Sequence, residues 1–265
     1  MQLKFQKMQA AGNRILIVDQ RSGNSLLPSA NILDAVRNSE LGADFDQLMW
    51  LSTAQDQAAV ASYRVFNFDG SEVEQCGNGA RCVAVSLAKQ QPQPQELLLE
   101  SPAGMIRARI LGEQRASVNM GTPRFDDAID TLAVAGTQLR VNIVFMGNPH
   151  CVLDVADVKT ADVAGLGPAI EGHAQFPNRI NVGFMRIIDR NHIDLRVYER
   201  GAGETLACGT GACAAVASGH RRGLLDDEVY VQLPGGELVV SWRGAADSVW
   251  LTGDAEFISQ GEIDI

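Results

Sequence analysis

The sequence has few of the residues that build metal sites, disulfide frameworks or membrane spans. Its 265 residues include four histidines and five cysteines, and no Cys-x-x-Cys pair occurs. No apolar run approaches the roughly 20 residues that cross a bilayer. The first eight residues lack the apolar core and cleavage site of a secretory signal. The sequence therefore predicts a cytoplasmic protein with reduced thiols and no bound metal.

Basic residues are also scarce. Lys and Arg number 22 against 32 Asp and Glu, which gives a formal net charge of −10. Nucleic acids and anionic membrane surfaces are bound by clustered cations, so neither is expected as a partner. The hydrophobic fraction of 46% is ordinary for a globular protein, and the length allows one large or two medium domains.

The chain contains one motif twice. Cys-Gly-x-Gly-Ala begins at Cys76 and again at Cys208, an offset of 132 positions (208 − 76). The same offset relates residues outside the motif: Arg64 to Arg196, Glu72 to Glu204, Pro102 to Pro234 and Gly121 to Gly253. An offset of half the chain indicates two similar lobes rather than a solenoid. We expect lobes at 1–130 and 131–265, with the active site in the cleft between them.

Each lobe reads as many short strands around one apolar helix. The stretches 81–90 and 212–222 are apolar on nearly every side, which favours buried helices over amphipathic ones. The predicted fold class is therefore α+β, with two pseudo-symmetric lobes, each a mostly antiparallel sheet wrapped around a central helix. Shorter helices are expected at 32–39, with Asn31 as the cap, and at 166–171.

The two repeated cysteines stand where the buried helices begin. Unpaired backbone N–H groups and the helix dipole favour a thiolate there, and the same donors can hold a carboxylate. If the two motifs face each other, one thiolate can remove the α-proton of an amino acid. The opposite thiol then supplies a proton from the other face, with no cofactor. The alternatives are two small buried side chains or a disulfide; Cys82, Cys151 and Cys213 are expected in the core.

These motifs resemble those of diaminopimelate epimerases over nearly the whole chain. The resemblance lies in segments 63–67, 76–82, 147–152, 178–185 and 198–212. It implies two lobes, each a sheet on a central helix, and a small-molecule amino acid as the substrate. The implied reaction interconverts LL- and meso-diaminopimelate by a cofactor-independent, two-cysteine mechanism, on the bacterial route to lysine and peptidoglycan. Members of the family are often homodimers.

The resemblance also implies roles for individual residues. Cys76 and Cys208 match the two acid/base cysteines, and His150 and Glu199 match residues that help to set the protonation of the thiols. The remaining matches are substrate contacts, and Glu199 is also one of these. The carboxylate of the reacting centre would be held by Gly77, Asn78, Gly209 and Thr210. The rest of the pocket and the distal end of the substrate would be contacted by Asn13, Gln47, Asn67, Asn148, Asn181 and Arg200.

Two alternative functions remain open at this point. One is a related racemase of another amino acid, such as histidine or proline; a proline racemase has no need of a polar clamp for a second amino-acid head. The other is a non-catalytic amino-acid-binding protein, which has no need of two matched cysteines. The pattern also departs from the family at 9–14, where Asn13 is kept but Arg14 replaces an acidic residue.

Overall fold

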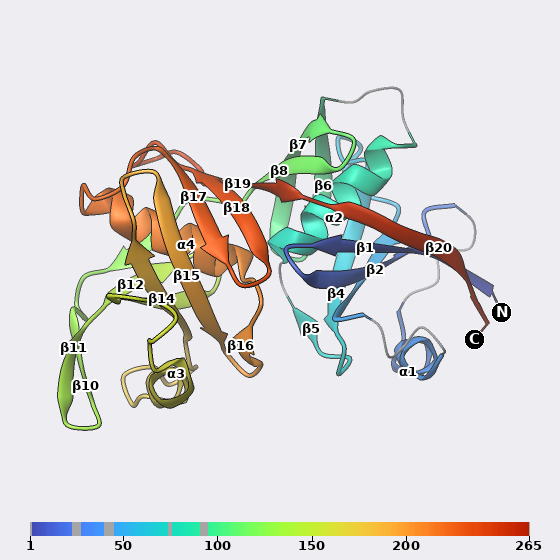
Figure 1. Ribbon diagram of the computed structural model, residues 1–265. Helices are drawn as coiled ribbons and strands as arrows, with labels where there is room; N and C mark the ends of the chain where they lie inside the picture. Colours follow the sequence, from blue (N-terminus) through green and yellow to red (C-terminus); the bar gives the residue numbers. More distant parts are fainter. Residues whose placement is uncertain (1, 23–27, 40–44, 74–75, 91–94, 265) are drawn as a thin grey trace. The chain divides into compact units, whose positions relative to one another are not determined.

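The computed structural model describes residues 2–22, 28–39, 45–73, 76–90 and 95–264, which belong to two compact units (Figure 1). Unit 1 is Met1–Val118 with Gly253–Ile265, and unit 2 is Asn119–Thr252. The chain thus leaves unit 1 before the expected boundary at 130. It returns at the end because β20 (Glu256–Asp264) pairs antiparallel with β1 (Gln2–Ala10).

Unit 1 is a mostly antiparallel sheet that surrounds one buried helix. Its other strands are β2 (Asn13–Asp19), β3 (Gln47–Ser52), β4 (Ala61–Asn67), β5 (Glu72–Val73), β6 (Glu96–Ser101), β7 (Gly104–Gly112) and most of β8 (Arg115–Asn119). The helix α2 (Gly77–Ala88) contacts β1, β2, β3 and β7, and every residue from Gly77 to Leu87 is buried. A second helix, α1 (Ala30–Asn38), is amphipathic and buries Leu33 and Val36.

Unit 2 has the same plan. Its strands are β9 (Arg124–Asp126), β10 (Thr131–Val134), β11 (Thr137–Arg140), β12 (Asn142–Phe145), β13 (Pro149–Asp154), β14 (Asn181–Ile187), β15 (His192–Glu199), β16 (Gly203–Thr205), β17 (Glu228–Leu233), β18 (Gly236–Ser241) and most of β19 (Trp250–Asp254). The buried helix α4 (Gly209–Arg221) contacts β12 to β15 and β18. The helix α3 (Val163–Glu171) packs on β14, β15 and β16. The α+β prediction is confirmed.

The repeat seen in the sequence extends to strand order and to single ion pairs. In unit 1, β2–β3 is parallel, β3–β4 antiparallel and β4–β6 parallel; in unit 2, β13–β14, β14–β15 and β15–β17 follow the same order. Arg64 donates to both carboxylate oxygens of Glu72 at 2.6 Å. At equivalent positions, Arg196 donates to Glu204 at 2.6 and 2.8 Å.

The starts of the two shorter helices differ from the expectation. Ser29, not Asn31, caps α1, because its hydroxyl accepts from the N–H of Ile32. The helix α3 begins at Val163 rather than at residue 166, because Asp162 accepts from the N–H of Gly165 at 2.9 Å. Of the helices formed by the described residues, none is long and apolar enough to cross a membrane.

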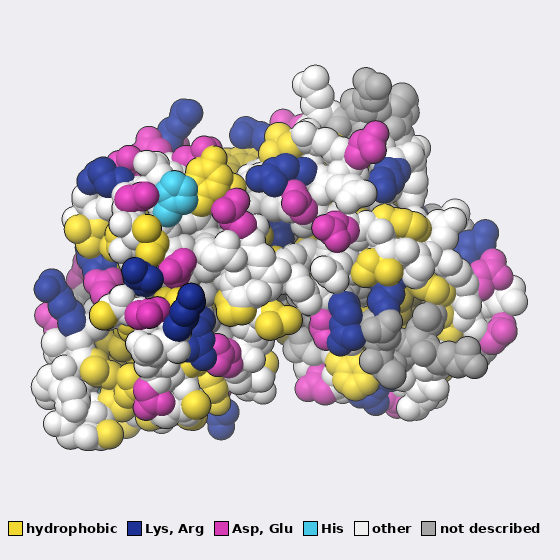
Figure 2. Space-filling view, in the orientation of Figure 1, with side chains coloured by type: hydrophobic (Ala, Val, Ile, Leu, Met, Phe, Trp, Pro, Cys, Tyr) yellow, Lys and Arg dark blue, Asp and Glu magenta, His cyan; other side chains and the backbone are white. Residues whose placement is uncertain are grey.

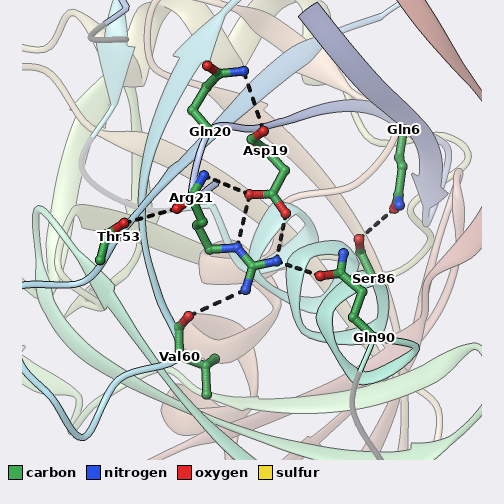
Figure 3. A network of polar contacts seen from close by, with 8 residues as sticks. All are labelled: Gln6, Asp19, Gln20, Arg21, Thr53, Val60, Ser86 and Gln90. Atoms are coloured by element: carbon green, nitrogen blue, oxygen red, sulfur yellow. Dashed lines mark hydrogen bonds and ion pairs between the residues drawn. The ribbon is translucent and has the colours of Figure 1, made fainter. Parts of the chain in front are cut away.

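A polar network fixes the C-terminal end of α2 (Figure 3). Ser86 donates to Gln6 on β1, and Arg21 donates to Gln90 Oε1, both at 2.5 Å. Burial alone would raise the pKa of Asp19, but hydrogen bonds from Arg21 outweigh it, so this pKa lies below its usual value. These contacts hold the C-terminal end of α2 against β1 and against the segment that follows β2.

Opposite charges lie side by side on the surface. On the face shown in Figure 2, Lys and Arg side chains are interspersed with Asp and Glu side chains. Exposed pairs include Arg115 with Asp254 at 2.8 Å and Arg221 with Asp127 at 2.7 Å. Such exposed pairs contribute little to stability because water screens them.

Candidate active site

Cys76 is the N-cap of α2 and has hydrogen-bond partners for both of its protonation states. Its sulfur accepts from the N–H of Gly79 at 3.2 Å, which favours the thiolate. The thiol can also donate to Gln47 Oε1, 2.8 Å from the sulfur, which favours the protonated form. Because both the thiol and the thiolate of Cys76 have a partner here, this sulfur can release a proton and take one up again.

Three polar side chains form a chain that ends at Cys76. Gln47 Oε1 also accepts from Asn13 Nδ2 at 3.2 Å, and Gln47 Nε2 donates to Asn67 Oδ1 at 3.0 Å. The strand register places them together, because Gln47 lies opposite Asn67 in the β3–β4 pair. Asn13 Oδ1 is buried without a hydrogen-bond partner in the part of the chain that the structure describes, so it is an acceptor that a ligand can satisfy.

The side chain of Asn78, in the first turn of α2, is engaged within the helix. The side chain of Asn78 is buried, and its Oδ1 accepts from the Arg81 guanidinium at 2.8 Å. Arg81 is fully buried and also reaches the carbonyl oxygen of Gly77 at 3.4 Å. An anion at this turn would therefore be bound by the backbone N–H groups of Gly77 and Asn78, and not by the Asn78 side chain. The sequence signal for Arg81 is a charge within an otherwise apolar helix.

Cys208 is the N-cap of α4, and its sulfur contacts a carboxylate. The thiol donates to Glu199 Oε2 at 3.1 Å, and Thr210 Oγ1 lies 3.5 Å from the sulfur. Thr205 donates to the other oxygen of Glu199 at 2.5 Å and so fixes that side chain. Burial, and after it the Glu199 charge, raises the pKa of Cys208 well above its usual value. This thiol therefore retains its proton at neutral pH.

The other predicted residues of unit 2 gather at the ends of β13, β14 and β15. His150 Nε2 lies 2.9 Å from Asn148 Oδ1, and Asn181 donates to the carbonyl oxygen of Pro149 at 2.9 Å. Asn181 Oδ1 accepts from the backbone N–H of Arg200 at 3.0 Å. Burial, followed by the Arg200 charge, lowers the pKa of His150 to about 3, so its imidazole is neutral at physiological pH.

Each unit thus brings its own predicted residues together. In unit 1, Asn13, Gln47 and Asn67 connect to Cys76; in unit 2, Glu199 and Thr210 contact Cys208, while Asn148, His150, Asn181 and Arg200 form a second group. All five cysteines are free. Within the described residues, no cluster of three or more His, Cys, Asp or Glu side chains could hold a metal ion.

Comparison with known proteins assigns the family. A sequence model described as diaminopimelate epimerase matches residues 5–125 and 142–258. The chain belongs to the diaminopimelate epimerase family. As a member of this family it is an isomerase.

Individual family members cover the whole chain. It is 46% identical to the diaminopimelate epimerase of Laribacter hongkongensis (strain HLHK9) over 280 residues, which covers 100% of both chains. It is 45% identical to that of Chromobacterium violaceum, again over 100% of both chains. Among solved structures, a hydroxyproline epimerase from Agrobacterium vitis has a similar fold, with a TM-score of 0.75 at 17% identity, covering 99% of this chain and 92% of that one.

Proposed function

We propose that this protein is a cofactor-independent epimerase that interconverts LL- and meso-diaminopimelate, in the biosynthesis of lysine and peptidoglycan. The observation that carries the proposal is the matched pair of cysteines, each the N-cap of the buried helix of its unit. A binding protein has no need of that pair. Membership of the diaminopimelate epimerase family supports the choice of substrate.

The two helix starts supply the chemistry of proton exchange. The backbone N–H groups at Gly77–Asn78 and at Gly209–Thr210 would hold the carboxylate beside the reacting carbon, and they stabilise the negative charge that develops there. The thiolate of one cysteine takes the α-proton, and the electron pair of the C–H bond stays on the substrate as a carbanion. The thiol of the other cysteine then protonates that carbon from the opposite face, so the two sulfurs exchange roles.

The surroundings of Cys208 support a starting assignment. Its raised pKa and its contact with Glu199 keep it protonated, so Cys208 begins the cycle as the acid and Cys76 as the base. After the forward reaction Cys208 is the thiolate, because its proton has gone to the substrate carbon, and it is then the base of the reverse reaction. His150 is buried and neutral, so it adds no charge to the group that it forms with Asn148.

The polar groups beyond the cysteines favour a substrate with a second amino-acid head. Asn67 in unit 1, and Asn148, Asn181 and Arg200 in unit 2, provide amide and guanidinium groups for a distal ammonium and carboxylate. A racemase of proline has no use for these groups. One substrate must reach both sulfurs, so we infer that the half-sites of the two units close on it. The dependence on free thiols favours a reducing compartment, the cytoplasm.

Proton NMR in D₂O tests the reaction directly. Reduced protein should remove the α-proton signal of LL-diaminopimelate, and Cys76→Ser and Cys208→Ser should each lower turnover by about 10²-fold or more, the scale of a lost acid or base. Cys213→Ala, a cysteine buried within α4 rather than at its cap, should retain activity. Exchange with another amino acid alone would point to a different racemase. Full activity in either Ser variant would rule out the two-cysteine mechanism.

A further inference from the structure

Glu171, the last residue of α3, is a buried carboxylate. Its side chain is 10% exposed. Carboxylates are seldom buried unless they are paired and hydrogen-bonded, because loss of hydration is costly. The contacts of Glu171 therefore indicate what it does, and none of the motifs in the sequence points to it.

One oxygen of this carboxylate joins two separate segments. Glu171 Oε1 accepts from the backbone N–H of Gly201 at 2.8 Å and from the Arg179 guanidinium at 3.4 Å. Gly201 directly follows Arg200 in the turn between β15 and β16, and Arg179 directly follows Asn178 before β14. Glu171 thus ties the Arg200 turn to the segment that leads into β14.

The same two segments hold Arg200 itself. Its backbone N–H donates to Asn181 Oδ1 at 3.0 Å, and its guanidinium donates to the carbonyl oxygen of Asn178 at 3.2 Å. Arg200 is otherwise exposed, and a free arginine side chain loses up to about 2 kcal/mol of conformational entropy when it is fixed. Fixing the turn in advance lowers this cost when a ligand binds.

Two further features constrain the segments that hold the turn. Arg179 has φ of 57°, a left-handed conformation that a non-glycine residue keeps only where its surroundings enforce it. The helix α3 lies directly on β15, since a Cβ at Gly167 would be 2.6 Å from ring atoms of Tyr198. Tyr198 is two residues before Arg200. The Glu171 carboxylate therefore comes from a helix, α3, that packs closely against β15, the strand that leads to the Arg200 turn.

We propose that Glu171 is a positioning residue that sets the Arg200 guanidinium for the distal carboxylate of the substrate, and so helps to determine which amino acids bind. This rests on the proposed function, because it assumes that Arg200 binds that carboxylate. Glu171 does not itself touch the substrate. Its loss should weaken substrate binding more than it slows the chemistry, which takes place at the cysteines.

Steady-state kinetics with LL-diaminopimelate separates the two effects. Glu171→Ala should raise KM about tenfold while kcat falls less than about threefold. Glu171→Gln should raise KM less, because its amide oxygen still accepts from the Gly201 N–H. The matched control is Glu204→Gln, which removes a carboxylate from the same hairpin that pairs with Arg196 instead, and it should change KM less than about twofold.

A double-mutant cycle shows whether Glu171 acts through Arg200. The KM of Glu171→Gln combined with Arg200→Ala should equal that of Arg200→Ala alone, because the positioned group is already gone. If the two increases multiply, or if KM stays unchanged in both Glu171 variants, the inference is wrong. An unchanged KM in Arg200→Ala would overturn the distal assignment as well.

Amide hydrogen exchange measures the hydrogen bond between Glu171 and the Gly201 N–H without any substrate. The Gly201 amide should exchange faster in Glu171→Ala than in the wild type, with Glu204→Gln unchanged. Unaltered protection of Gly201 would overturn the inference even if the enzyme is an epimerase. Faster exchange in a protein that does not act on diaminopimelate would support the positioning role and overturn only the proposed substrate.

Discussion

At the scale of single residues, Glu199 contributes to the raised pKa of Cys208. Burial is the main reason that the pKa of this thiol is raised, and the negative charge of Glu199 adds to it. In Glu199→Gln the charge is removed, while the amide oxygen can still accept from Thr205. We therefore expect the pKa of Cys208 to fall but to stay above its usual value, so its thiolate forms at a lower pH than in the wild type.

The pH dependence of iodoacetamide alkylation at Cys208, read by peptide mass spectrometry, measures this change. Burial raises the pKa of Cys82 and of Cys151 to about 12, so neither competes near neutrality. Glu199→Gln should shift the alkylation midpoint to lower pH and reduce turnover by up to about 10²-fold, because Cys208 is then less strongly favoured as the thiol that protonates the substrate. A midpoint that stays or rises would contradict this role, and Glu204→Gln should leave it in place.

Single residues also show where the sequence pattern is a poor guide. Arg14 stands where the family usually has an acid, yet its guanidinium and its backbone N–H both bind the Asp46 carboxylate, each at 2.8 Å. The neighbouring Asn13 still reaches Gln47. The departure is thus compensated by a contact across 32 positions of sequence, which no local pattern could predict.

At the scale of elements, the glycines of α4 allow Cys208 to lie against its helix. A Cβ at Gly211 would be 3.0 Å from Val197 Cγ2 and 3.4 Å from the Cys208 sulfur. Val197 is a β-branched side chain on a central strand and cannot move away easily. We expect Gly211→Ala to displace the sulfur from Glu199 and to lower kcat at least about tenfold, since a small misplacement of a reacting group is costly.

Turnover and far-UV circular dichroism of Gly211→Ala test this, with Ser218→Ala in the same helix as the control. The Ser218 hydroxyl is buried and has no hydrogen-bond partner among the described residues, so its removal should leave both kcat and stability unchanged or raise stability slightly. Full activity in Gly211→Ala would show that the close contact does not matter.

The elements that could be predicted from the sequence are those with a local or repeated signal. The buried helices α2 and α4 were predicted from their apolar composition and the offset of 132, and the caps at Cys76 and Cys208 agree with the motif. The strand β20 carries no such signal, because its place is decided by pairing with β1 at the other end of the chain. The hairpin β10–β11 lies where a boundary was expected, and its turn uses Ala135 and Gly136 at positive φ.

The site was predictable to a similar extent. Residues inside the motifs and the family pattern, such as Gln47 and Glu199, lie against the two sulfurs. Glu171 and Thr205 were not singled out, because a supporting contact depends on which segments the fold brings together. Their equivalents at an offset of 132 are Ser39 and Val73, so the repeat gives no indication of either.

The two units share a backbone plan but differ in what contacts each cysteine. In unit 1 the partner of the sulfur is the neutral amide of Gln47, and in unit 2 it is the carboxylate of Glu199. A duplicated fold thus carries an unequal pair of thiols. In the proposed reaction one sulfur begins as the base and the other as the acid, and these unequal partners favour Cys208 as the acid.

At the scale of the whole molecule, the proposed reaction requires both sulfurs to reach one substrate carbon, and oxidation tests this requirement. Two cysteines form a disulfide only when their Cα atoms come within about 7 Å of each other. A disulfide between Cys76 and Cys208 would therefore show that the two sulfurs can approach the same substrate carbon. Diamide takes up the two electrons and two protons released.

We expect diamide to link Cys76 to Cys208 and abolish activity, with recovery on reduction and slower inactivation when substrate is present. Peptide mapping without reduction identifies the link, and Cys76→Ser should prevent it. Oxidised protein that keeps full activity, or a link between other cysteines, would show that the two half-sites do not meet.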